Sequence, residues 1–324
     1  MVNTLSIIIP VYRNAESIPD LIAALAVVAQ RAAKKFACAT EVVFVVDGSP
    51  DNSYALLAQA LPAAPFSSQL LLHSRNFGSF AAIRTGLQAA RGEHYGIIAA
   101  DLQEPPELVL QFLEKLRSGE CDVVVGCREN RQDPLSSRFA SDLFWKLYKK
   151  FVIREIPEKG VDVFGCNQVF RDHLLQLGEA NSSLVGLIFW LGFKRGEVMY
   201  ERRAREHGKS AWTLKKKINY LLDSVFSFTD LPIKLLSLFG LLGVSASILL
   251  GIAVLLAKIF GNIVVPGYAA TVLTVIFFGG LNSLGLGIVG AYAWRAYENT
   301  KGRPLAVVMA SQRFNGTSSQ SHKE

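Results

Sequence analysis

Two long apolar segments without charged residues constrain this chain more than any other feature of its sequence. Residues 235–257 and residues 268–294 contain no charged side chain, and only ten residues separate them. At 1.5 Å per residue, a helix over the first segment would be about 34 Å long, which is enough to cross the core of a bilayer. Two such segments rarely occur in a soluble domain. We therefore expect a C-terminal two-helix transmembrane hairpin within residues 231–297, in preference to a large buried core hairpin.

Basic residues flank the two apolar segments. They are Lys215, Lys216, Lys217 and Lys234 before the first segment, and Arg295, Lys301 and Arg303 after the second. By the positive-inside rule, this distribution predicts that both termini face the cytoplasm. The N-terminal residues do not have the pattern of a secretory signal peptide, because polar residues follow a short apolar stretch at once. We expect a multi-pass protein of the inner (plasma) membrane whose large N-terminal part stays in the cytosol.

Strand-like and helix-like patterns alternate over the first 127 residues. The strand-like runs are LSIIIPVY, EVVFVV, QLLLH, HYGIIAAD and DVVVG. Five strands with intervening helices predict an α/β domain with a doubly wound, mostly parallel sheet. The first of these strands does not lead into a Gly-x-Gly-x-x-Gly turn, so the glycine loop that cradles phosphates in dinucleotide-binding folds is absent.

The remaining segments complete the predicted organisation. We place the α/β domain at residues 1–210. Residues 211–230 combine aromatic side chains with three lysines directly before the first apolar segment, which predicts an amphipathic helix at the membrane interface. Residues 298–324 form a cytosolic tail, and we expect its polar end, from Ser311 onward, to be disordered.

Three aspartates lie at the ends of predicted strands. Asp47 and Asp101 follow strands of the same sheet and should face one crevice, and Asp162 stands beside a further apolar run. Gln103 follows Asp101 two residues later. A carboxylate and an amide oxygen are hard ligands that suit Mg²⁺ or Mn²⁺, metals that take further ligands from water and from the phosphates of a substrate. The alternative is that each aspartate only forms a turn.

The net charge of +7 is concentrated before the hairpin. Residues 194–217 contain nine Lys or Arg and three Glu. One interpretation is attraction of this segment to anionic lipids. The other is that a group of basic residues binds the phosphate of a lipid headgroup; this group consists of Arg202, Arg203, Arg205 and Lys209. Nucleic-acid binding is not expected, because the rest of the domain is not basic.

Six motifs, in this order and followed by the two apolar segments, carry a resemblance to a known family. They are SIIIPVY, VDGSPDNS, RNFGSFAAIRTGL, ADLQEPPE, VVVGCREN and REHGKS. The chain resembles the polyprenyl-phosphate glycosyltransferases of glycosyltransferase family 2, relatives of dolichyl-phosphate mannose synthase, and in particular the bacterial bactoprenol glucosyltransferases. The resemblance implies a GT-A (Rossmann-like) catalytic domain, a UDP-sugar donor and a divalent metal. It also implies inverting transfer to a polyprenyl monophosphate such as undecaprenyl phosphate.

The resemblance assigns the donor side of the site. Pro10 and Tyr12 resemble residues that line the nucleobase pocket, and Asp47 resembles the aspartate that contacts uracil or ribose. Asp101 and Gln103 resemble the metal-binding positions, which makes Asp101 both a donor-binding and a catalytic residue.

The resemblance also assigns the acceptor side. Arg128, with Arg131 and Arg138 beyond it, would reach the phosphates of the acceptor or the donor. Arg205 and Lys209 resemble basic residues of the motif that precedes the membrane. From the resemblance to this type of enzyme we also expect a homo-oligomer, such as a tetramer.

The chain departs from the family pattern at two acidic positions. Val46 and Ala99 stand where the family often has aspartate. Fewer acids suffice if the acceptor is a phosphate monoester, because its second pKa lies near 6 and it arrives largely ionised, without needing a general base. Asp162 would then orient a sugar hydroxyl or the acceptor.

Two other functions stay open from the sequence. A processive polysaccharide synthase shares the sheet and the acidic strand ends, but it carries a Gln-x-x-Arg-Trp motif that this chain lacks and more membrane spans. A catalytically inactive, membrane-anchored nucleotide-sugar-binding protein is the second alternative, because of the two missing acids. The sequence does not fix the sugar; glucose is what the resemblance implies.

Overall fold

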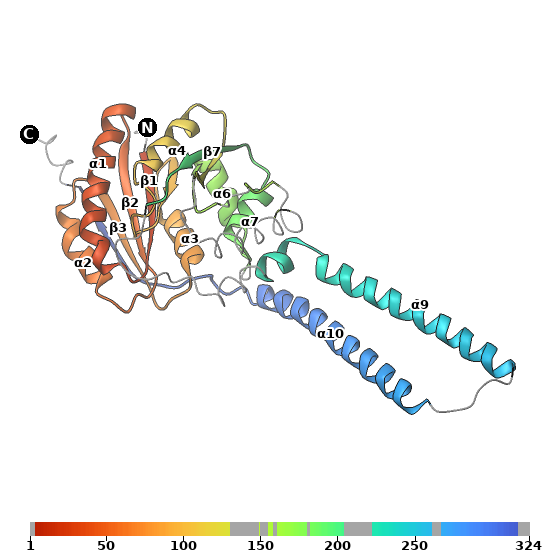
Figure 1. The fold of residues 1–324 in the computed structure, drawn as a ribbon. Helices are drawn as coiled ribbons and strands as arrows, with labels where there is room; N and C mark the ends of the chain where they lie inside the picture. Colours follow the sequence, from red (N-terminus) through yellow and green to blue (C-terminus); the bar gives the residue numbers. More distant parts are fainter. Residues whose placement is uncertain are drawn as a thin grey trace, which may run out of the picture.

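The computed structural model of the chain describes residues 4–129, 149, 155–157, 161–179, 182–203, 222–260 and 267–316. These residues form an α/β domain from which two long helices extend (Figure 1). The strands are β1 (Thr4–Val11), β2 (Ala39–Val46), β3 (Ser67–His73), β4 (His94–Ile97), β5 (Val123–Arg128), β6 (Val163–Asn167), β7 (Arg195–Tyr200) and β8 (Val308–Phe314). The helices are α1 (Ile18–Phe36), α2 (Ser53–Ala60), α3 (Ser79–Ala89), α4 (Leu108–Arg117), α6 (Gln168–Gln176), α7 (Leu184–Trp190), α9 (Leu231–Ile259) and α10 (Tyr268–Thr300).

Alternating side chains of the central strands fill two cores, one on each face of the sheet. In β1, Ile8 belongs to the core that includes side chains of α3, α6 and α7, whereas Ile7 and Ile9 belong to the core that includes side chains of α1, α2 and α4. All three side chains are fully buried, and each contributes about 2 kcal/mol through removal from water. A strand buried on both faces reads as a continuous apolar run, which is why the run SIIIPV predicts its strand so well.

The described strands form one sheet in the order β7-β5-β6-β4-β1-β2-β3-β8. The five strands predicted from the sequence are confirmed as β1 to β5, and the centre, β4-β1-β2-β3, is parallel. The predicted sequence of strands does not show β6, which runs antiparallel between β4 and β5. β7 then pairs in parallel with β5.

The direction of β6 determines which residues lie at the C-terminal ends of the parallel strands, which form one edge of the sheet. Strands β1, β2, β4, β5 and β7 all end at this edge, because they run in the same direction. β6 runs the opposite way, so it starts there. Asp162, directly before β6, is thereby placed at the same end of the strands as Asp101, which follows β4. Open α/β sheets bind their ligands at such an edge.

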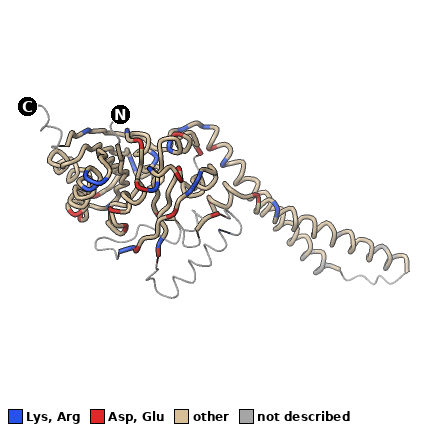
Figure 2. Tube along the Cα trace, turned by 90° about the horizontal axis from the view of Figure 1, so that it is seen from above, with Lys and Arg blue, Asp and Glu red and all other residues tan. Residues whose placement is uncertain are grey.

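The two long helices lie side by side and project from the domain (Figure 1). Figure 2 shows charged residues on the domain and at the base of the helices, while the middle of each helix carries none. Among the described helices, the segment Leu231–Ala253 of α9 is long and apolar enough to cross a membrane. α9 and α10 cover the two apolar segments, and the predicted transmembrane hairpin stays a prediction.

Contacts at the base connect the helices to the segment before α9. Arg295 of α10 donates to Asp223 at 2.7 Å, and the Tyr292 hydroxyl donates to the Thr229 carbonyl at 3.3 Å. Of the predicted interfacial helix, residues 222–228 are helical and residues 211–221 lie outside the described part of the chain.

The C-terminal strand corrects one expectation. After α10 the chain returns to the domain, and β8 pairs antiparallel with β3 at the edge of the sheet. Residues 311–314 are therefore ordered in a strand and not disordered; residues 317–324 lie outside the described residues. The prediction was wrong because β8 is an edge strand with mostly exposed side chains, and its second half, from Ser311, begins with three polar residues. The prediction of disorder used only the types of side chain. β8 is ordered by the backbone hydrogen bonds that it forms with β3, which amino-acid composition does not reveal.

Candidate active site

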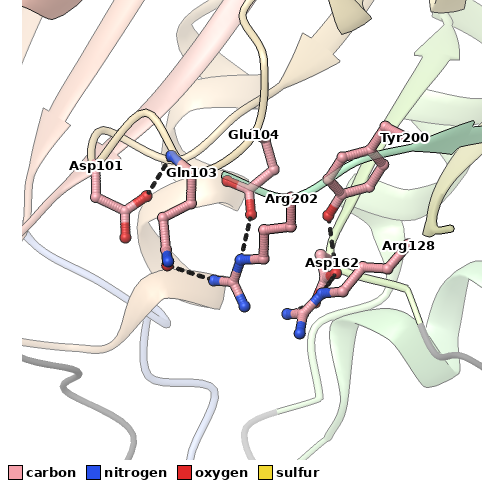
Figure 3. A network of polar contacts seen from close by, with 7 residues as sticks. All are labelled: Asp101, Gln103, Glu104, Arg128, Asp162, Tyr200 and Arg202. Carbon is pink, nitrogen blue, oxygen red and sulfur yellow. Dashed lines mark hydrogen bonds and ion pairs between the residues drawn. The ribbon is translucent and has the colours of Figure 1, made fainter. Parts of the chain in front are cut away.

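The loop after β4 presents Asp101 and Gln103 at the sheet edge. The Ser17 hydroxyl, at the start of α1, donates to the Ala100 carbonyl at 2.8 Å and fixes the end of this strand. Leu102 has a φ of 55°, a left-handed conformation that is unfavourable for leucine by about 1 kcal/mol. Its side chain packs against the core beside α1 and α4, which offsets that strain. In the resulting turn the backbone N–H of Gln103 donates to an Asp101 carboxylate oxygen at 3.3 Å (Figure 3).

Arg202 joins this loop from the segment after β7. Its Nη2 donates to Gln103 Oε1 at 2.5 Å, and its Nε lies 3.5 Å from Glu104 Oε1 (Figure 3). The next amide, of Arg203, donates to the Gln103 carbonyl at 2.9 Å. Glu104 is only 3% exposed. Burial raises the pKa of Glu104 to about 7, although Arg202 acts in the opposite direction.

A second ion pair lies next to the first. Arg128, at the end of β5, donates through Nε and Nη2 to the two oxygens of Asp162, and the Tyr200 hydroxyl donates to Asp162 at 2.8 Å (Figure 3). Burial by itself lowers the pKa of Arg128, but the Asp162 carboxylate outweighs it and raises that pKa. Burial and the same carboxylate raise the pKa of Tyr200. We call the seven residues of Figure 3 the charged corner: Asp101, Gln103, Glu104, Arg128, Asp162, Tyr200 and Arg202.

Asp47 follows β2, which β1 separates from β4, and its carboxylate is bound by groups of the protein itself. Its carboxylate accepts from the backbone amides of Phe77 and Gly78, each at 2.8 Å, and lies 2.8 Å from His73 Nδ1. The His73 Nε2 lies 3.0 Å from the Thr85 hydroxyl, so Nδ1 carries the proton toward Asp47 if the threonine donates. Asp47 is 2% exposed. Its predicted contact with uracil or ribose stays a prediction; the described contacts position the loop that starts α3.

The loops after β1 and β2 are bound to each other by short side chains. The Arg13 amide donates to the Ser49 hydroxyl at 2.8 Å, and the Ala15 amide donates to Asp51 Oδ2 at 3.0 Å. Together with residues 74–78 beside Asp47, we call residues 12–15 and 47–53 the loop cluster. Pro10 and Tyr12, the predicted nucleobase residues, are half-buried at its rim, and their role stays a prediction.

The donor atoms at Asp101 and Gln103 fit a divalent cation that shares its coordination with a substrate. The described residues contain no group of three or more His, Cys, Asp or Glu that could hold a metal ion. Gln103 Oε1 accepts one hydrogen bond from Arg202, but an amide oxygen has a second lone pair. With two hard oxygens from the protein, the remaining ligands would have to come from water and a diphosphate.

The structure thus brings together four of the predicted site residues in the charged corner: Asp101, Gln103, Arg128 and Asp162. Four others, Arg131, Arg138, Arg205 and Lys209, lie outside the described residues. Arg202, which the sequence groups with a lipid phosphate, contacts Gln103 and Glu104 instead.

Sequence reasoning missed two members of the charged corner. Glu104 stands inside the motif ADLQEPPE, and an acid beside two predicted ligands is a signal that could have found it. Tyr200 has no such signal, because it ends an ordinary strand and meets Asp162 only through the pairing of β7 with β5.

Comparison with known proteins identifies the family. Residues 6–178 match the family described as glycosyl transferase family 2. The chain is 32% identical over 307 residues to the uncharacterized glycosyltransferase sll0501 of Synechocystis, covering 94% of each chain. It is 29% identical over 317 residues to the SfII prophage-derived bactoprenol glucosyl transferase of Shigella flexneri, covering 96% of this chain and 99% of the relative.

Among solved structures, mannosyl-3-phosphoglycerate synthase from Rubrobacter xylanophilus matches with a TM-score of 0.46 and 14% identity, over 69% of this chain and 72% of that one. This likeness is too low to bear on function. The sequence matches are sufficient: the family covers residues 6–178 of 324, and a curated glycosyltransferase is 32% identical over 94% of the chain. The chain, with its GT-A-like α/β fold, belongs to glycosyl transferase family 2 and is a glycosyltransferase.

Proposed function

We propose that the protein transfers a hexose, with glucose as the first candidate, from a UDP-sugar to a polyprenyl monophosphate such as undecaprenyl phosphate. The observation that carries this proposal is the position of the charged corner. Arg202 belongs to this corner and lies less than thirty residues before α9 in the sequence. The proposed nucleotide-sugar site is therefore close in sequence to the apolar helices. The relative named as a bactoprenol glucosyl transferase, aligned over 96% of this chain, supports the same acceptor class.

On the donor side, the loop cluster would hold the nucleoside and the charged corner the diphosphate. Pro10, Tyr12 and Asp47 are our candidates for the nucleoside. Asp101 and Gln103 would hold Mg²⁺ or Mn²⁺, which when bound neutralises the charge that develops on the leaving UDP. The hydrogen bond from the backbone N–H of Gln103 would hold the Asp101 carboxylate in position to bind the metal.

On the acceptor side, the nucleophile would be the phosphate itself. A phosphate monoester is largely a dianion at neutral pH and attacks the anomeric carbon without losing a proton to the protein. The new bond forms between a phosphate oxygen and C1 while the bond from C1 to UDP breaks on the opposite face, so the configuration inverts. Asp162 is held through both oxygens by Arg128 and Tyr200, which suits an orienting residue better than a general base.

Basic residues would bind the acceptor phosphate and limit its repulsion from the donor. Arg128, at the end of β5, is the candidate that the structure describes, and the further candidates are Arg131, Arg138, Arg205 and Lys209. Arg131 and Arg138 follow Arg128 in the sequence, and Arg205 and Lys209 follow Arg202. A matching test is Lys209→Ala, which should reduce use of the lipid phosphate more than hydrolysis of the UDP-sugar.

The two helices α9 and α10 would anchor the enzyme in the inner membrane as a hairpin, with both termini and the α/β domain in the cytoplasm. Large apolar side chains on both helices are exposed, among them Leu241, Leu249 and Leu286, each about two-thirds exposed. A homo-oligomer in the bilayer is part of this proposal. Of two reporters fused after Glu324, the one that is active in the cytoplasm should show activity, and the one that is active in the periplasm should not.

The reaction tests the proposal directly. Full-length protein in lipid nanodiscs receives undecaprenyl phosphate, Mg²⁺ or Mn²⁺, and one labelled UDP-hexose at a time. One lipid-linked monosaccharide, formed only with added metal, is the expected product. A long polymer would instead identify a processive synthase, and binding of donors without any product would identify an inactive binding protein.

Asp101→Ala should reduce the rate of this transfer at least about a hundredfold, because the variant loses the only carboxylate among the proposed metal ligands. The temperature of unfolding should stay close to that of the wild type, since Asp101 is half-exposed. Glu120→Ala, which removes an exposed carboxylate from the loop before β5, is the matched control and should keep full activity. Wild-type turnover by Asp101→Ala would remove this residue from the site.

A further inference from the structure

The ion pair between Glu104 and Arg202 is poorly suited to a purely structural role. Glu104 is 3% exposed, yet its second oxygen, Oε2, has no hydrogen-bond partner among the described residues, and neither does Arg202 Nε. The two groups stand 3.5 Å apart, too far for a strong hydrogen bond. A buried ion pair with unsatisfied atoms is weak for stability, because loss of hydration outweighs much of the attraction.

The same pair is well suited to hold a guanidinium in one place. Arg202 is fixed at one end by Gln103 Oε1, at 2.5 Å, and along its side by Glu104. The backbone of the next residue, Arg203, is also bonded to Gln103. In the view of Figure 3, the guanidinium groups of Arg202 and Arg128 both end on the lower side of the charged corner. Each is anchored by one carboxylate, Glu104 or Asp162.

We propose that Glu104 is a positioning residue, which holds Arg202 so that the remaining N–H groups of its guanidinium bind a phosphate group of a substrate beside Gln103. This inference rests on the proposed function and goes beyond it, because it gives a role to an acid that neither binds substrate nor belongs to the metal ligands. A guanidinium has five N–H donors in a fixed plane, and its use in binding phosphate depends on the orientation of that plane.

The phosphate has two sources that share this chemistry, the diphosphate of the nucleotide sugar and the monophosphate of the lipid. Arg202 lies against Gln103, on the donor side, and directly precedes the basic segment that leads to the membrane. Kinetic measurements separate the two sources, because a loss in donor binding raises the KM for the UDP-sugar and a loss in acceptor binding raises the KM for the lipid phosphate.

Glu104→Gln in the full-length protein tests the proposal. Glutamine keeps the volume and removes the charge that orients Arg202. We expect kcat/KM to fall about tenfold or more, as for other residues that orient a ligand-binding group, while the temperature of unfolding stays the same or rises. A structural ion pair predicts the reverse: a lower unfolding temperature, and full activity per folded molecule.

Two further variants show whether Glu104 acts through Arg202. Glu104→Asp keeps the charge and should restore part of the lost kcat/KM. The double variant Glu104→Gln with Arg202→Gln should be no worse than Arg202→Gln alone, because the positioned group is already absent. Independent, additive losses would overturn the proposal, and so would a Glu104→Gln variant with unchanged KM and kcat.

Binding of UDP in the presence of Mn²⁺, measured by titration, keeps this inference distinct from the proposed function. If the wild type binds UDP but forms no lipid-linked sugar with any donor, the proposed function fails. In that case, weaker UDP binding by Glu104→Gln still supports the positioning role on the donor side, and unchanged UDP affinity rejects it.

Discussion

The loop cluster and the charged corner lie along one edge of the same sheet, but different kinds of contact hold them in place. In the loop cluster, short side chains such as Ser49 and Asp51 bond to backbone amides of the adjoining loop. In the charged corner, charged and polar side chains bond to one another across 34 to 99 residues of sequence. The first arrangement fixes the backbone, and the second fixes the ends of side chains against one another.

This difference suits two tasks. A nucleoside is bound by shape, which calls for a rigid backbone, whereas phosphates and a metal are bound by charge, which calls for groups that can exchange one partner for another. Changes in the loop cluster should therefore reduce stability first. Changes in the charged corner should reduce turnover first.

Gly48→Ala should have the largest effect on stability. Gly48 has a φ of +57°, and a Cβ there would lie 2.3 Å from the backbone carbon of Arg75, a contact that neither loop can avoid without moving. We expect the free energy of unfolding of the full-length protein to fall by about 3 kcal/mol or more. Thermal unfolding in detergent measures this change.

Gly119→Ala is the matched control for the Gly48 variant. Gly119 has a φ of +74°, but a Cβ there would have no atom within 4 Å. Its substitution should cost about 1 kcal/mol, the penalty of the backbone conformation alone. Equal losses in the two variants would show that the two loops do not pack tightly against each other.

Much of the loop cluster could be predicted from the sequence. The strands that lead into it are continuous apolar runs, and Tyr12 and Asp47 follow them directly. Strand ends in a parallel sheet share one edge, so the grouping follows once the strands are recognised. The sequence did not predict that the Asp47 carboxylate is occupied by His73 and the amides of residues 77 and 78, because those contacts depend on the packing of a third loop.

The charged corner could be predicted only in part. Its local pair, Asp101 and Gln103, is visible as two ligand-type residues in one turn. Its long-range pairs depend on β6 and β7, two strands that the alternating pattern does not show, and β6 enters the sheet antiparallel. A short strand with ordinary residues carries no signal for its direction. Tyr200 and Arg202 could therefore not be placed beside Asp162 and Gln103.

Tyr200→Phe should have a smaller effect than Gly48→Ala. It should lower turnover and leave the stability unchanged. It removes the hydroxyl that donates to Asp162 at 2.8 Å and leaves both bonds from Arg128. The loss of one hydrogen bond of about 1 kcal/mol corresponds to a decrease of about fivefold in kcat/KM. Steady-state rates with UDP-hexose and lipid phosphate measure it.

Tyr95→Phe is the matched control for the Tyr200 variant. The Tyr95 hydroxyl is also buried and donates to the Gly92 carbonyl, but it lies at the start of β4, at the opposite edge of the sheet. This variant should lose stability and keep kcat/KM. If both variants kept full turnover, Asp162 would not need Tyr200, and the charged corner would be smaller than described.

Asp51→Asn should have the smallest effect, and that effect should depend on pH. Burial alone would raise the pKa of Asp51, but hydrogen bonds from Ser49, Ser53 and Ala15 outweigh it and lower this pKa below its ordinary value of 3.8. A lowered pKa in the folded state means that the ionised carboxylate stabilises the protein above the ordinary value, and that this contribution is lost as pH falls through the lowered one.

The wild type should therefore unfold at a higher temperature than Asp51→Asn above about pH 5, and the difference should shrink as pH falls below 4. Thermal unfolding of both full-length proteins between pH 3 and 7 measures this difference, with Glu120→Gln as the control for an exposed carboxylate outside the loop cluster. A difference that stayed constant down to pH 3 would mean that the loops need the second acceptor oxygen of this side chain and not its charge. The loop cluster would then be held by neutral contacts alone, and the contrast with the charged corner would be sharper.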